Sequence, residues 1–123
     1  MITLLNDYFR IDSRTVENDE TVFHVTLLPG YSVYAGHFPG NPVSPGVCNI
    51  QMIKECAGLL TGKQLFLGYI SRCRLSAVIT PQTTPQLQVR MQLTETDRRY
   101  EVRAKVCDGT TTYIEFKGEF TPV

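Results

Sequence analysis

A histidine in a segment rich in proline and glycine is the first candidate for chemistry in this sequence. His37 opens the run His37-Phe38-Pro39-Gly40-Asn41-Pro42. An imidazole has a reference pKa near ~6.5, so it can be neutral at working pH and accept a proton. Because prolines restrict the backbone, such a loop loses little entropy when it positions the ring for reaction. The pattern predicts that His37 is a general base, the alternative being a loop histidine that only hydrogen-bonds a carbonyl group.

A helix start follows directly and offers a second chemical feature. Ser44 is a good N-cap, and Pro45 suits the first helical position. The first turn of a helix presents unpaired backbone N–H groups and the positive end of the helix dipole. Gly46 has no side chain to block a ligand, so a carbonyl group bound at Gly46 and Val47 would be polarised as charge develops on its oxygen. The alternative is that Pro-Gly only starts the helix, and both can hold together.

The helix predicted after this loop is apolar on nearly every side. Its residues from Val47 to Leu60 are mostly apolar, and Gly62 suits its C-terminal end. Only Gln51, Lys54 and Glu55 form a narrow polar arc. A helix that is apolar nearly all round must be enclosed, and the rest of the chain can supply that enclosure.

The remaining segments read as strands with alternating polarity. Residues 8–16 and 21–28 precede the helix, and 65–78, 87–93, 100–106 and 113–120 follow it, with an Asp108-Gly109 hairpin signal before the last. The other histidine, His24, is expected on a strand face. Two strands, one buried helix and a four-strand antiparallel meander predict an α+β fold, in which a strongly curved sheet wraps the helix. Residues 1–123 are expected to form a single domain.

Composition excludes several classes of function. Twelve basic and twelve acidic residues balance, so a nucleic-acid-binding protein is not expected. No apolar run reaches the ~20 residues of a membrane span, and the first residues do not resemble a secretory signal. The four cysteines show neither a CxxC motif nor zinc-like spacing, so no metal site is predicted. Reduced, mostly buried thiols favour a cytoplasmic protein.

One stretch of the chain is locally basic. Lys54, Lys63, Arg72 and Arg74 stand against the single acid Glu55 between residues 54 and 74. Such a patch could dock an acidic partner while the molecule as a whole stays neutral. A solvated face is an equally good interpretation of these charges.

The run from His37 to Pro42, followed by Ser44-Pro45-Gly46-Val47, resembles the signature of FabZ-type 3-hydroxyacyl-[acyl-carrier-protein] dehydratases. These enzymes have the hot-dog fold, in which an antiparallel sheet wraps a long central helix. The resemblance implies that His37 removes the proton alpha to a thioester, and that Gly46 and Val47, with the Phe38 backbone, hold the thioester carbonyl. It implies no cofactor and a substrate carried as acyl-phosphopantetheine on acyl carrier protein, with enoyl thioesters as products in fatty-acid or related biosynthesis.

The resemblance also implies an assembly. Members of this dehydratase family form dimers, which often assemble further into hexamers. In such a dimer, paired sheets would place His37 of one subunit near the helix of the other. Within this family the basic residues Lys63, Arg72 and Arg74 would suit an acidic carrier protein.

One position departs from the family in a way that matters for chemistry. The family has a catalytic glutamate six positions after the proline of the Pro-Gly-Val start, and this chain has Gln51 there. An amide is too weak an acid to protonate a departing hydroxyl, although it can hydrogen-bond to one. Elimination then requires His37 to carry the proton from carbon to oxygen, or Glu55 to serve as an auxiliary acid through a water. The alternatives are an acyl thioesterase, or a non-catalytic acyl-binding subunit of a heteromeric dehydratase.

Overall fold

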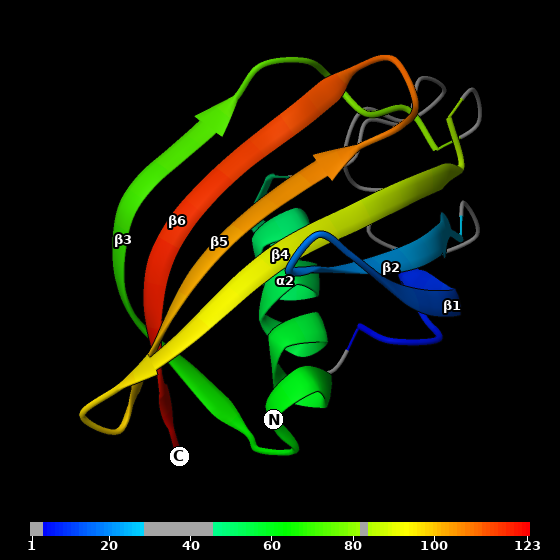
Figure 1. Ribbon diagram of the computed structural model, residues 1–123. Coiled ribbons are helices and arrows are strands. Elements are labelled where there is room, and N and C mark those ends of the chain that lie inside the picture. Colours follow the sequence, from blue (N-terminus) through cyan, green and yellow to red (C-terminus); the bar gives the residue numbers. More distant parts are fainter. Residues whose placement is uncertain (1–3, 29–45, 82–83) are drawn as a thin grey trace.

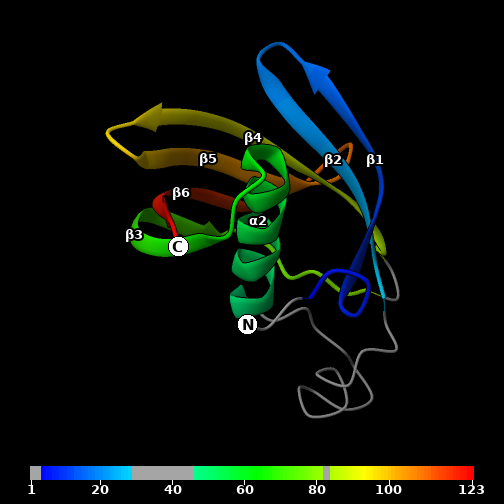
Figure 2. The same ribbon diagram turned by 90° about the horizontal axis from the view of Figure 1, so that it is seen from below.

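The computed structural model describes residues 4–28, 46–81 and 84–123, which form one curved antiparallel sheet and a helix (Figure 1). The sheet has six strands in the spatial order β1-β2-β4-β5-β6-β3. In chain order the elements are β1 (Phe9–Glu17), β2 (Glu20–Leu27), α2 (Gly46–Thr61), β3 (Leu65–Leu75), β4 (Gln86–Thr96), β5 (Arg99–Cys107) and β6 (Thr112–Pro122). The α+β class is confirmed, and Figure 2 shows α2 lying inside the curve of the sheet.

Two tight turns fix the register of the hairpins. Asn18 and Asp19, between β1 and β2, have φ angles of 48° and 69°. Asp97 and Arg98, between β4 and β5, have φ angles of 48° and 62°. Two consecutive left-handed residues are the geometry whose twist matches that of the flanking strands, and Asn and Asp tolerate it well.

The predicted four-strand meander is wrong in one strand. Strands β4, β5 and β6 do pair in sequence, but β3 pairs with β6 rather than with β4. The chain after β3 therefore crosses to the middle of the sheet, where β4 pairs with β2. Strand β3 becomes an edge of the sheet, opposite the other edge strand β1.

The helix buries one side against the sheet. Met52, Ile53, Cys56 and Ala57 are fully buried, and they pack with the inward-facing residues of the strands. The helix ends as predicted at Gly62, whose φ of +71° lets its N–H bond to the carbonyl of Gly58 at 2.8 Å. The predicted cap at Ser44 and Pro45 lies outside the described residues.

Within residues 4–28, 46–81 and 84–123, the expected enclosure of the helix is incomplete. Val47 and Leu59 are 75% and 48% exposed on α2. The described strands pack against the other side of the helix and do not cover these two side chains.

The alternation predicted for the later strands is confirmed. The inner-facing residues of the central strands are buried except Leu93, which is partly buried; the buried ones include Leu87, Val89, Met91, Tyr100, Val102, Ala104, Val106, Ile114, Phe116 and Phe120. Gly118 is required on the same face of β6, because a Cβ there would lie 2.7 Å from the carbonyl oxygen of Tyr69. Its lack of a side chain lets β3 approach at a point where the pairing register shifts.

Candidate active site

The N-terminus of α2 is the part of the predicted site that the structure describes best. Gly46 is its first residue, and a Cβ there would meet Cδ1 of Leu75 at 3.2 Å. The end of β3 therefore lies against the helix start, where the sequence places the thioester carbonyl. Val47 follows as an exposed residue. His37 and Phe38, the other two residues of this predicted site, lie outside the described residues.

Gln51 lies five residues further along the helix, about 7.5 Å from Gly46 at 1.5 Å rise per residue. Its side-chain amide donates a hydrogen bond from Nε2 to Oε2 of Glu55 at 3.0 Å. Residues four apart on a helix share a face, so this bond fixes the orientation of the amide. The structure brings Gln51 and Glu55 together, as their shared polar arc predicted.

The carboxylate of Glu55 accepts two hydrogen bonds from the N-terminal segment of the chain. Its Oε2 accepts the backbone N–H of Leu4 at 2.8 Å, and its Oε1 accepts that of Leu5 at 3.0 Å. The carboxylate thus ties residues near the N-terminus to the middle of α2. These contacts support a positioning role for Glu55, which accepts hydrogen bonds from the amide of Gln51 and from the backbone of Leu4 and Leu5.

A groove of about 450 Å³ runs along this side of the helix. Gln51 and Glu55 line it together with Gly58 and Lys63. Lys63 donates a hydrogen bond from Nζ to the hydroxyl of Tyr100 at 2.9 Å, and this bond raises the pKa of the lysine. Its ammonium group is therefore held at the C-terminal end of the groove.

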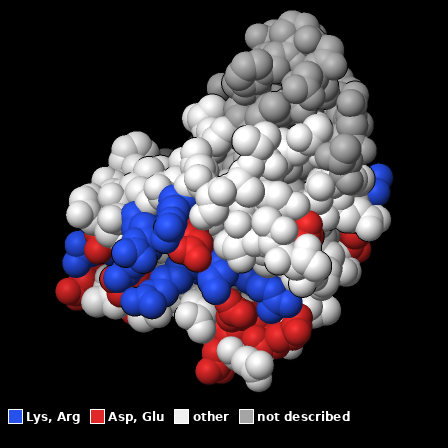
Figure 3. All heavy atoms as spheres, turned by 90° about the horizontal axis from the view of Figure 1, so that it is seen from above, with Lys and Arg blue, Asp and Glu red and all other residues white. Residues whose placement is uncertain are grey.

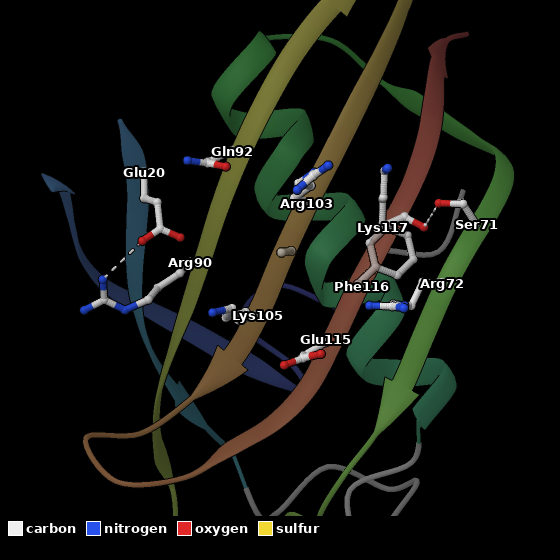
Figure 4. A pocket seen from close by; sticks show the side chains of 11 residues that line it. Glu20, Ser71, Arg72, Arg90, Gln92, Arg103, Lys105, Glu115, Phe116 and Lys117 are labelled. Carbon is white, nitrogen blue, oxygen red and sulfur yellow. Dashed lines mark hydrogen bonds and ion pairs between the residues drawn. The ribbon is translucent and has the colours of Figure 1, made fainter. Parts of the chain in front are cut away.

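The predicted carrier-docking residues do not share one surface. Lys63 lines the groove along α2, whereas Arg72 lines a different groove on the outer face of the sheet (Figure 4). Arg74 is exposed two residues further along β3, in register with Glu115. The sequence therefore grouped residues that belong to two sides of the molecule.

Three features were missed at the sequence level. Tyr8 donates a hydrogen bond to the buried Asn49 at 2.7 Å, which gives that amide a partner inside the core. Leu75 contacts the helix start, although nothing in its neighbourhood in the sequence indicates this. The third feature is the outer-face group of cations, which the alternation of Arg103 and Lys105 with buried residues of β5 could have indicated.

No group of three His, Cys, Asp or Glu side chains that could hold a metal ion occurs within residues 4–28, 46–81 and 84–123. In the same ranges no helix is long and apolar enough to cross a membrane. His24 lies on β2, as predicted, with Nε2 3.4 Å from Oγ1 of Thr15. Burial raises the pKa values of the thiols of Cys48, Cys56, Cys73 and Cys107, which are all free.

The sequence model of the ApeI-like family, described as ApeI dehydratase, matches residues 13–113. The chain belongs to the ApeI-like dehydratase family. Similar sequences support this assignment. A 3-hydroxyacyl-[acyl-carrier-protein] dehydratase FabZ of Lactobacillus helveticus is 32% identical over 94 residues, which cover 66% of this chain and 64% of that protein. The FabZ of Lactiplantibacillus plantarum is 36% identical over 67 residues, covering 49% and 46%.

Solved structures show that this ApeI-like chain has the hot-dog fold. The dehydratase heterocomplex ApeI:P of Xenorhabdus doucetiae matches with a TM-score of 0.72 at 19% identity, over 91% of this chain and 96% of that one. A putative thioesterase of Lactococcus lactis matches with a TM-score of 0.70 at 11% identity, over 100% and 98%. At these identities the likeness concerns the fold, which dehydratases and a putative thioesterase share.

Proposed function

We propose that this ApeI-like chain dehydrates (3R)-hydroxyacyl thioesters on acyl carrier protein to trans-2-enoyl thioesters, in fatty-acid or related acyl-chain biosynthesis in the cytoplasm. The observation that carries the proposal is the arrangement on α2. Gly46 begins the helix, and Gln51, held by Glu55, lies about 7.5 Å further along it at the family's second catalytic position. Membership of the family supports the reaction class.

In this mechanism His37 removes the proton from C2 of the acyl chain. Charge develops on the thioester oxygen, which the N–H groups of the helix start at Gly46 and Val47, and of Phe38, stabilise. The C2–C3 double bond forms as the C3–O bond breaks. The imidazolium of His37 gives its proton to the hydroxyl oxygen as this bond breaks, so that water leaves. Gln51 donates a hydrogen bond that orients the hydroxyl, and no cofactor takes part.

The working unit we propose is a dimer. The exposed Val47 and Leu59 need a cover, and the edge strand β3 needs a partner. The family resemblance implies that in such a dimer His37 of one subunit lies near the helix of the other. Further assembly into a hexamer would leave this pairing unchanged.

The second candidate is a heteromeric dehydratase in which this chain binds the acyl group and a related chain supplies the acid. Gln51, in place of the family glutamate, is the observation that favours it. A dehydratase heterocomplex is also among the structures with the same fold. The third candidate, an acyl thioesterase, would release free thiol instead of enoyl product.

The decisive experiment incubates the purified protein with a 3-hydroxyacyl carrier substrate and follows the enoyl product and free thiol. We expect enoyl product from the wild type and a loss of at least ~10²-fold in His37→Ala, the usual contribution of a general base. An undiminished rate in His37→Ala would overturn the mechanism. Product formed only after a chain with glutamate at the matching position is added would favour the heteromeric candidate, and free thiol the thioesterase.

A further inference from the structure

Three cations lie directly opposite one another on the outer face of the sheet. Arg72 of β3 is in register with Lys117 of β6, and Lys117 is in register with Arg103 of β5. Phe116 and Ala104, next to Lys117 and Arg103, are buried on the inner face, so these two cations point outward. Arg72 lines the same outer groove (Figure 4). We call Arg72, Lys117 and Arg103 the cation row.

The cation row is unfavourable for the isolated chain. Residues directly opposite in an antiparallel pair have Cβ atoms about 5 Å apart, and like charges there destabilise the sheet. In the described part of the chain, the four ion pairs include none of these three residues. The residues outside the described ranges contain neither Asp nor Glu. No carboxylate side chain from those segments can therefore neutralise the row.

The row crosses a broad groove of about 600 Å³. Arg90 and Lys105 also line it, so five cations stand against the two carboxylates of Glu20 and Glu115. Glu20 lies 3.6 Å from Arg90, at the margin of the groove away from the row. Figure 3 shows Lys and Arg side chains gathered on this side of the molecule. The outer face is locally positive although the whole chain is neutral.

The charges favour an acidic protein over other polyanions. Nucleic-acid interfaces are much more positively charged than protein–protein interfaces. In this groove a phosphate backbone would pass the carboxylate of Glu115. A bilayer is flat, whereas this face is convex (Figure 1). A folded acidic protein can instead place single carboxylates against the cation row. Glu115 would then contact solvent or a cationic side chain of that protein.

We propose that the cation row is the docking surface for the acidic carrier protein. This inference rests on the proposed function, which supplies that partner, and it assigns docking to Lys117 and Arg103 with Arg72 rather than to Lys63. The strand that bears Arg72 ends at Leu75, whose side chain contacts the position of Gly46. A carrier bound to the row would therefore lie beside the strand that leads to the helix start, where the thioester must arrive.

The test compares two variants with the same change in net charge. The row variant is Arg72→Gln/Arg103→Gln/Lys117→Gln. The control is Arg10→Gln/Arg14→Gln/Arg98→Gln, which removes three exposed cations elsewhere. Each is assayed with one 3-hydroxyacyl group on the carrier protein and on free pantetheine. We expect the row variant to raise KM for the carrier substrate about tenfold and to flatten its salt dependence, with the pantetheine substrate and the control unchanged.

Binding of the carrier protein, measured by titration calorimetry, separates this inference from the proposed function. If the wild type binds the carrier and the row variant does not, the docking proposal is supported even where no enoyl product forms. Equal affinity of the wild type and the row variant would overturn docking, even where dehydration is intact. Wild-type protein that binds anionic vesicles or duplex DNA through the row, but not the carrier, would also overturn it.

Discussion

The contact between Gln51 and Glu55 is the point at which this chain departs most from an ordinary acid–base pair. The amide donates to a carboxylate that already accepts two backbone N–H groups. Each partner is thereby fixed by the other. In the mechanism we propose, Gln51 orients the hydroxyl of the substrate and His37 transfers the proton.

Restoring the acid should restore proton donation. In Gln51→Glu two carboxyl groups would lie about 3 Å apart, where the Gln51–Glu55 hydrogen bond is now. Two carboxylates at that distance cannot both ionise easily, so the pair should keep a proton near neutral pH. We expect the kcat for dehydration to rise by roughly 10²-fold or more, with the gain lost as the pH rises and the pair ionises. A fall in kcat at every pH would show that Gln51 serves another reaction.

Glu55 should matter for stability as well as for orientation. Glu55→Ala leaves the N–H groups of Leu4 and Leu5 without their acceptor in a partly buried place. Hydrogen bonds to charged groups contribute more than neutral ones, so we expect the free energy of unfolding to fall by about 1–3 kcal/mol in urea denaturation. Glu101→Ala, at an exposed site on β5, is the control and should change it by less than about 0.5 kcal/mol. Equal stability of the two variants would contradict a structural role for Glu55.

At the level of single residues, the sequence predicted that Gln51 and Glu55 lie together but not that Glu55 binds the backbone of the N-terminal segment. The spacing of Gln51 and Glu55 places them on one face of the helix, which is local information. The bonds from Leu4 and Leu5 span about fifty residues and involve backbone groups. Backbone groups leave no mark in residue types, so this anchoring could not be predicted.

At the level of elements, the pairing of β3 could not be predicted because it too depends on residues far apart in the sequence. Alternation predicted the buried faces of β4, β5 and β6, since that pattern depends only on neighbouring residues. It does not say which strand pairs with which. Strand β3 follows a helix and precedes a crossing segment, so no tight turn ties it to β4, and its partner is instead the last strand, β6.

The cation row makes a prediction about the stability of strand pairing. Lys117 lies between Arg72 and Arg103, so Lys117→Glu would replace two like-charge contacts with two opposite ones. Cross-strand pairs of this kind differ by roughly 0.2–1 kcal/mol each, and we expect the melting temperature to rise. The control is Glu115→Gln, which removes a charge on the same strand and should not stabilise the protein, because Glu115 faces cations in both neighbouring strands. A lower melting temperature for Lys117→Glu would show that the row does not repel itself.

The β5–β6 turn should make stability depend on pH. Asp108 accepts hydrogen bonds from the Tyr113 hydroxyl and from the backbone N–H groups of Thr110 and Thr111, and these hold the pKa of its carboxyl well below the usual range. A lowered pKa means that the unfolded chain binds more protons below pH ~4, so stability is present above that pH and is lost on acidification. We expect the melting temperature of the wild type to fall more between pH 5 and pH 2 than that of Asp108→Asn. Parallel curves would contradict this origin.

At the scale of the whole molecule, the two edges of the sheet differ. The β1 edge carries mainly polar and charged residues. On β3, by contrast, Phe66, Tyr69, Ile70 and Leu75 are all exposed. A long apolar edge strand is a template for pairing with another strand, and proteins usually protect such an edge with charge or cover it. The β3 edge has therefore the composition of an interface, and pairing there would also bring a second copy toward the exposed side of α2.

A lysine on the β3 edge should separate the subunits. Tyr69→Lys places a charge in the middle of the proposed strand pair, whereas Val16→Lys places the same charge on the opposite edge, at a residue that is 75% exposed. By light scattering coupled to size-exclusion chromatography, we expect dimers for the wild type and Val16→Lys and monomers for Tyr69→Lys. Dehydration should be lost with the dimer, because in the dimer we propose each site would combine the His37 segment of one subunit with the helix of the other. A fully active monomer would instead mean that one chain builds the whole site from its own loop and helix.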